Sequence, residues 1–168
     1  FLSPSSSLDN LPWKAALEFY LGFDKLDGET KVMGIAAFGD PEKYDLTVLN
    51  RYRGKDFRVN TKLLNVVGLR RFKHRRIAHS FSPALLDQLG PRRAGDVFQD
   101  PYVHYAAGIQ RLYENAAAGL VMHYLNDVLS DSGKLVVVGA GAYNIKLNQR
   151  LSELPRVKEL YVPPAAGD

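Results

Sequence analysis

The pattern of hydrophobic and polar positions is most regular at the carboxyl-terminal end of the chain. An unbroken apolar run, Leu135–Val138, is followed by a glycine turn, Gly139–Asn144, and by an amphipathic stretch from about residue 143 to 154. A second apolar run, Leu160–Val162, leads into the segment Pro163–Asp168. Short apolar runs without alternation are typical of strands that are covered on both faces, as in parallel sheets. The pattern therefore predicts a strand, a turn, a helix, a second strand and a loop.

These elements form a βαβ unit, in which both strands run in the same direction and both following loops leave the carboxyl end of the sheet. Open α/β sheets bind ligands along this edge. The glycine turn also opens a helix, whose unpaired N–H groups and dipole favour anions. The backbone near Gly141 is therefore a candidate phosphate site, with Asp168 close by. A turn that only connects two elements, and a solvated carboxylate, remain open as alternatives.

Helical periodicity predicts further elements along the chain. A helix capped by Asp9 or Asn10 ends at Gly22, and a short helix spans residues 82–89. The longest helix begins at Asp100, as the cap, and continues to Leu129 with one apolar face. The residues of that face are Tyr105, Ile109, Leu112, Ala116, Leu120, Tyr124 and Val128. Alternation over residues 56–60 predicts a half-exposed strand.

The stretch Lys31–Gly39 is apolar, small and bracketed by glycines, which predicts either a short buried helix or a loop packed beneath a ligand. Lys31 is its only charged residue. One interpretation is a cation that faces a phosphate or a carbonyl oxygen. The other is a lysine at the edge of the core whose ammonium group extends into water.

The composition indicates a globular protein. The chain has 168 residues, 46% of them hydrophobic, and we expect one domain over residues 1–168, after a Ser/Pro-rich connector at residues 1–8. There are no cysteines, which excludes disulfides, thiol chemistry and Cys-type zinc sites. No apolar run is as long as a membrane span and no signal peptide is visible, so we predict a cytoplasmic location without a membrane partner. Since the chain begins at Phe1 and stops within a loop, we expect a piece of a longer protein.

The net charge of +4 is concentrated in one segment. Residues 51–76 hold ten Lys or Arg residues and one acid, Asp56, a local net charge of +9. Such a segment is usually a solvated surface, and the alternative is a module that binds RNA or an acidic partner. We expect nucleic acid not to be a partner.

Several blocks, distributed over nearly the whole chain, resemble the O-carbamoyltransferase family of nodulation and antibiotic-biosynthesis enzymes. The similar blocks occur in the order of the family. They are Tyr20–Phe23, Gly28–Gly39, Leu89–Gly95, Ala106–Gln110 with Glu114, Gly139–Asn148 and Pro163–Asp168. Residues 44–80 match weakly.

The resemblance implies an α/β fold with a mixed sheet and packed helices. The chain would be half of an actin-like and sugar-kinase-like (ribonuclease H-like) ATP-binding fold. It is related to the enzymes that place threonylcarbamoyl on tRNA. It also implies that a second domain makes carbamoyl-adenylate from carbamoyl phosphate and ATP. The domain represented here would then pass the carbamoyl group to a hydroxyl of a small-molecule natural product or sugar.

The resemblance also implies roles for individual residues. Gly139, Ala140, Gly141 and Asn144 would line the nucleotide, and Lys31 would border the adenylate pocket as a catalytic residue. Asp168 matches an aspartate that helps to hold a divalent metal ion, Fe²⁺, which would act as a Lewis acid on the carbamoyl oxygen.

This chain departs from the family pattern in three ways. Ala140 replaces the second glycine of the turn, and His104 replaces an aspartate at the head of the long helix. The histidine pair that completes the metal site lies upstream in the family, so the missing half-domain and the adenylate-forming domain are expected partners, and the piece alone is expected to be inactive.

A competing hypothesis is a dinucleotide-binding enzyme built on Gly139 and Gly141. That fingerprint needs an acid at the end of the second strand to hold a ribose. Pro163 and Pro164 follow this strand instead, which argues against a dinucleotide site.

Overall fold

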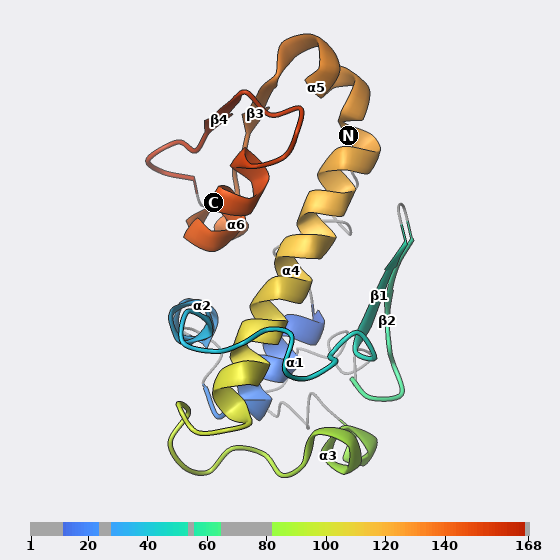
Figure 1. Ribbon diagram of the computed structural model, residues 1–168, viewed down its shortest axis with the longest axis vertical. Helices are drawn as coiled ribbons and strands as arrows, with labels where there is room; N and C mark the ends of the chain where they lie inside the picture. Colours follow the sequence, from blue (N-terminus) through green and yellow to red (C-terminus); the bar gives the residue numbers. More distant parts are fainter. Residues whose placement is uncertain (1–11, 24–27, 54–55, 65–81, 167–168) are drawn as a thin grey trace, which may run out of the picture. The chain divides into compact units, whose positions relative to one another are not determined.

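The computed structural model describes residues 12–23, 28–53, 56–64 and 82–166 (Figure 1). The elements follow one another as α1 (Pro12–Tyr20), α2 (Gly28–Ala36), β1 (Asn50–Arg53), β2 (Asp56–Val59), α3 (Pro83–Leu89), α4 (Tyr102–Tyr124), α5 (Asn126–Ser132), β3 (Lys134–Val136), the 3-10 helix η4 (Ala140–Tyr143), α6 (Ile145–Ser152) and β4 (Glu159–Tyr161). The described part is thus a mixed α/β structure with six α-helices and two two-stranded sheets, which confirms the predicted α/β class. Among these residues, no helix is long and apolar enough to cross a membrane.

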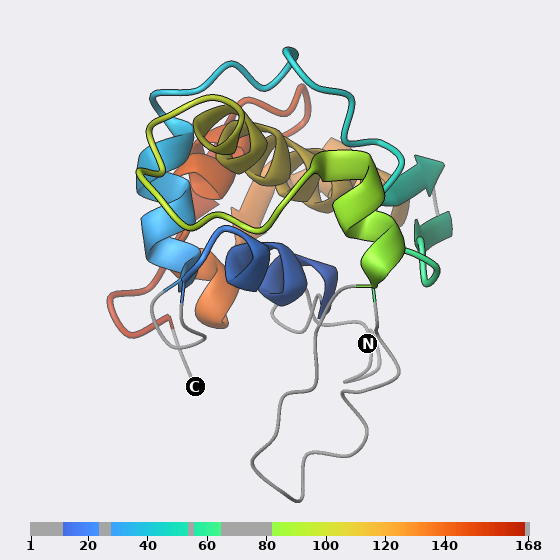
Figure 2. The ribbon, with the colours of Figure 1, turned by 90° about the horizontal axis from the view of Figure 1, so that it is seen from below.

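The chain divides into two compact units, one formed by Leu11–Arg51 and Arg58–Leu112 and the other mainly by Tyr113–Asp168. In the first unit α1 packs against α2, and Figure 2 shows α1 between α2 and α3. The largest side chains of its core are Leu17, Tyr20, Leu21, Leu49, Leu64, Leu85 and Ile109. The hydroxyl groups of Tyr20 and Tyr105 both donate to the carbonyl of Leu89, at 3.0 Å each, and so attach the end of α3 to this core.

The predicted stop of the first helix is confirmed at Gly22, whose φ of 83° lies in the left-handed region that favours glycine. Two arginines hold this end of α1. Arg92 donates through Nε to the carbonyl of Phe19 at 2.8 Å, and Arg93 donates through Nε to the carbonyl of Leu21. Cations that hydrogen-bond to the last carbonyl groups of a helix also interact favourably with the negative end of its dipole. The segment before α4, which carries both arginines, therefore stabilises α1.

The second unit contains the predicted strand, turn, helix and strand. Strands β3 and β4 pair in parallel, with Lys134, Leu135 and Val136 opposite Glu159, Leu160 and Tyr161 in turn. Leu135 of β3 is buried, and Leu147 and Leu151 of α6 are also buried. Gly133, at φ 64°, ends α5 in the left-handed conformation.

Two predictions about this unit are wrong in part. The long helix does not continue to Leu129, because Leu125 has φ −114° and ψ 6° and separates α4 from α5. The apolar face is therefore not continued past this break, and Tyr124 and Val128 are 49% and 59% exposed. Strand β3 is not covered on both faces either, since Val136 is 60% exposed in the described residues.

Candidate functional site

The two loops that the sequence places at the carboxyl end of the sheet lie next to each other. The N–H of Gly139 donates to the carbonyl of Ala166 at 2.5 Å, and the N–H of Val137 donates to the carbonyl of Tyr161 at 3.0 Å. Because β3 and β4 are parallel, this contact joins the start of the glycine turn to the loop after β4. The predicted convergence of the two loops is confirmed as far as Ala166. Asp168 lies outside the described residues.

The glycine turn is a 3-10 turn that leads directly into α6. The N–H of Ala142 donates to the carbonyl of Gly139, and the N–H of Asn144 donates to the carbonyl of Gly141, both at 3.0 Å. The buried Asn144 caps α6, since its Oδ1 accepts from the N–H of Leu147 at 2.9 Å. The N–H groups of Gly139, Ala142 and Asn144 thus already donate within the protein. The nucleotide role of Gly139, Ala140, Gly141 and Asn144 stays a prediction.

Asn148, to which the sequence analysis assigns no role, lies beside the glycine turn. It lies one turn into α6, and its Nδ2 donates to the carbonyl of Ala142 at 2.7 Å. Its Oδ1 is buried and has no hydrogen-bond partner among the described residues. Buried acceptors are nearly always paired in folded proteins, so this oxygen is available to a donor from a bound molecule. The only signal in the sequence was its place at the end of the Gly139–Asn148 block.

Lys31 lies in the other unit, on the exposed side of α2. Of the two structures expected for residues 31–39, a short helix with a buried side is observed, because Val32 and Ile35 are both buried. The Lys31 ammonium lies 6.0 Å from the centre of the Phe23 ring, within the range of a weak cation–π contact. Nothing in this geometry tests the catalytic role of Lys31.

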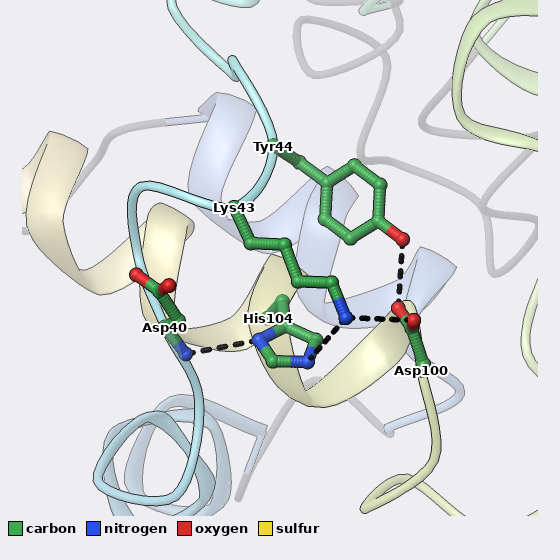
Figure 3. Close-up of polar contacts among 5 residues, drawn as sticks. All are labelled: Asp40, Lys43, Tyr44, Asp100 and His104. Atoms are coloured by element: carbon green, nitrogen blue, oxygen red, sulfur yellow. Dashed lines mark hydrogen bonds and ion pairs between the residues drawn. The ribbon is translucent and has the colours of Figure 1, made fainter.

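A cluster of polar side chains, which the sequence did not predict, joins the loop after α2 to the start of α4 (Figure 3). The Lys43 ammonium donates to Asp100 Oδ2 at 2.8 Å, and the Tyr44 hydroxyl donates to Asp100 Oδ1 at 2.7 Å. The N–H of Asp40 donates to His104 Nδ1 at 3.0 Å, and His104 Nε2 lies 3.3 Å from Lys43 Nζ. These five residues are here named the α2–α4 clasp.

The clasp changes the acid–base properties of its members. Hydrogen bonds from Lys43 and then from Tyr44 lower the pKa of Asp100, because they stabilise its ionised form. The hydrogen bond to Asp100 raises the pKa of Tyr44. Asp100 therefore does not act as the helix cap predicted from the sequence. Each of its oxygens accepts from the loop, and the N–H groups of Tyr102 and Val103 bond to the carbonyl of Gln99.

The described part of the chain shows no metal site and only part of the basic segment of the sequence analysis. Among residues 12–23, 28–53, 56–64 and 82–166, no group of three His, Cys, Asp or Glu side chains could hold a metal ion. Most of the basic segment at residues 51–76 lies outside the described positions or has side chains that are not described. The dinucleotide hypothesis gains nothing from the structure, because β4 ends at Tyr161 and is followed by Val162 and Pro163.

Comparisons with known proteins show similarity over nearly all of the chain. The family described as Carbamoyltransferase N-terminus matches residues 11–168. The nodulation protein NolO of Bradyrhizobium diazoefficiens is 31% identical over 151 residues, which covers 89% of this chain and 24% of that protein. The nodulation protein NolNO of Sinorhizobium fredii is 29% identical over 150 residues, covering 89% of this chain and 19% of that protein. An uncharacterized protein of Synechocystis is 29% identical over 160 residues, which covers 92% of this chain and 24% of that protein. The chain thus spans about a quarter or less of the length of these relatives.

Proposed function

Because the chain belongs to the carbamoyltransferase N-terminus family, we propose that it is part of an enzyme that transfers a carbamoyl group to a hydroxyl of a small-molecule acceptor. The family match over residues 11–168 is the observation that carries the proposal, and it confirms the resemblance predicted from the sequence. Since the chain covers 24% of NolO, the proposal concerns the whole protein, in which this chain supplies one part of the site.

The proposed donor is carbamoyl-adenylate, made elsewhere in the protein from carbamoyl phosphate and ATP. Gly139, Ala140, Gly141 and Asn144 would line its nucleotide, in one half of an actin-like fold. The hydrogen bond between Gly139 and Ala166 supports this placement, because it sets the glycine turn beside the second loop at the carboxyl edge of a parallel strand pair.

The transfer step is an acyl substitution. The acceptor oxygen forms a bond to the carbamoyl carbon, the bond from that carbon to the phosphate oxygen of the adenylate breaks, and AMP leaves while the hydroxyl proton is released. Negative charge develops on the carbamoyl oxygen and on the leaving phosphate. The Lys31 ammonium is the proposed cation that stabilises this charge.

The described residues do not form the Fe²⁺ site that the resemblance implies, since they contain no group of three ligating side chains. Asp168 remains a proposed carboxylate ligand, with its partner ligands supplied from outside the described residues. No step of the transfer is assigned to the metal here.

The test uses the protein at its full natural length with carbamoyl phosphate, ATP and Fe²⁺. Adenylate formation is followed as the release of pyrophosphate that depends on carbamoyl phosphate. Transfer is followed as radioactive carbamoyl incorporated into a panel of sugars and glycosides. We expect Asp168→Ala to abolish transfer and to leave adenylate formation intact, and the exposed Asp131→Ala to change neither. Equal loss of both steps in Asp168→Ala contradicts the assignment of Asp168.

A further inference from the structure

The α2–α4 clasp fixes the protonation state of the His104 ring. Nδ1 accepts from the N–H of Asp40 at 3.0 Å, so Nδ1 carries no proton. A neutral imidazole then has its proton on Nε2 and cannot accept a second hydrogen bond there. The Lys43 ammonium lies 3.3 Å from Nε2 and donates to Asp100. The ring is therefore neutral and joins the loop to α4 through Nδ1.

The loop that this contact holds is packed tightly on both sides of Asp40. A Cβ atom built on Gly39 would lie 2.2 Å from the carbonyl oxygen of Val103, so the backbone of the loop lies directly against the first turn of α4. On the other side, the Tyr44 ring packs at 5.0 Å from the Tyr105 ring in an edge-to-face arrangement. Asp40 lies between these two anchors, and its N–H donates to His104.

We propose that His104 is a positioning residue, whose unprotonated Nδ1 holds the loop of residues 37–44 and, with it, the end of α2. The helix α2 carries Lys31, which is the cation proposed above to stabilise charge during carbamoyl transfer. Displacement of the loop would therefore disturb the position of Lys31. In this respect the inference rests on the proposed function.

Protonation of the ring would place a hydrogen on Nδ1 opposite the N–H of Asp40, so two donors would face each other and the contact would be lost. The positive ring would also lie beside the Lys43 ammonium. Only the neutral ring therefore supports the contact with the Asp40 N–H.

The experiment compares wild-type protein of full natural length with two isosteric variants. In His104→Asn the side-chain oxygen replaces Nδ1 and does not titrate. In His104→Gln a polar group occupies the place of Nε2 while the acceptor at Nδ1 is lost. The kcat and the KM for ATP are measured for carbamoyl transfer at neutral pH.

We expect His104→Asn to keep the wild-type kcat and KM, because its side-chain oxygen still accepts from the Asp40 N–H. His104→Gln should be about two- to tenfold less active, which corresponds to the loss of one neutral hydrogen bond. Equal losses of activity in both variants would overturn the proposal, as would full activity in His104→Gln.

A second measurement does not depend on the reaction. The ¹⁵N shifts of the His104 ring should show the proton on Nε2 at neutral pH, and the Asp40 amide should be protected from hydrogen exchange in wild type and less protected in His104→Gln. A proton on Nδ1 at neutral pH would overturn the proposal. If the wild-type protein shows no carbamoyl transfer, the proposed function fails, and the ring spectra still decide the role of His104.

Discussion

The close approach of the Gly39 backbone to α4 gives the sharpest prediction of stability. In Gly39→Ala the new Cβ would lie 2.2 Å from the carbonyl oxygen of Val103, 2.8 Å from its carbonyl carbon and 2.9 Å from the Cβ of Ala107. Two of these atoms belong to the backbone of a helix and cannot rotate away. The loop must therefore move off α4.

The size of the effect follows from the cost of overpacking. A forced backbone shift in a well-packed site costs about 1–3 kcal/mol, and contacts with rigid helix atoms place Gly39→Ala at about 3 kcal/mol. For a chain of this size, 1 kcal/mol corresponds to about 2–4 °C in the melting temperature, so we expect a fall of about 6–12 °C.

Gly34→Ala is the matched control. Gly34 lies within α2, and nothing stands within 4 Å of a Cβ built there. Alanine is favoured over glycine in a helix by about 1 kcal/mol, so this variant should be slightly more stable than wild type. Both variants are compared by thermal and urea unfolding, followed by circular dichroism. If Gly39→Ala melts within about 2 °C of wild type, the packing of the loop against α4 is not as described.

Two further predictions concern hydrogen bonds of the candidate site. Asn144→Ala removes the cap of α6 and should lower the free energy of unfolding by about 0.5–2 kcal/mol. Asn144→Asp keeps the acceptor and serves as the control. Equal losses in both variants, measured by urea unfolding, would exclude the cap. The contacts from Lys43 and Tyr44 lower the pKa of Asp100 in the folded protein. They therefore stabilise the folded protein at pH values above the ordinary pKa of aspartate, about 4. This stabilisation is lost as the pH falls through the lowered pKa. The difference in melting temperature between wild type and Asp100→Asn should therefore shrink on acidification, and a difference that is independent of pH would contradict the assignment.

The sequence predicted those elements that local periodicity determines. The apolar runs and the glycine turn gave β3, α6 and β4 in the right order and direction, because a short βαβ connection allows one handedness. The break at Leu125 was missed, since an apolar residue in an apolar helical pattern gives no sign of non-helical dihedral angles. The exposure of Val136 was missed for a related reason, because a pattern of residue types does not show which faces are covered.

The sequence predicted less of the candidate site. The meeting of the Gly139 turn with the loop at Ala166 followed from the parallel strands. The α2–α4 clasp did not, because Lys43 and Asp100 are 57 positions apart and each resembles an ordinary surface charge. Asp100 beside Pro101 looked like a helix cap, and a tertiary ion pair prevailed over that local preference.

The hydrogen bond from Gly139 to Ala166 makes the two loops of the sheet edge mechanically dependent on each other. A bound molecule that draws the Gly139 amide toward itself must release or drag the Ala166 carbonyl, and a displacement that starts at Ala166 is transmitted to the turn in the same way. By reciprocity, occupancy at one loop then alters affinity at the other by the same factor. A single backbone contact can thus make the events at the two loops cooperative.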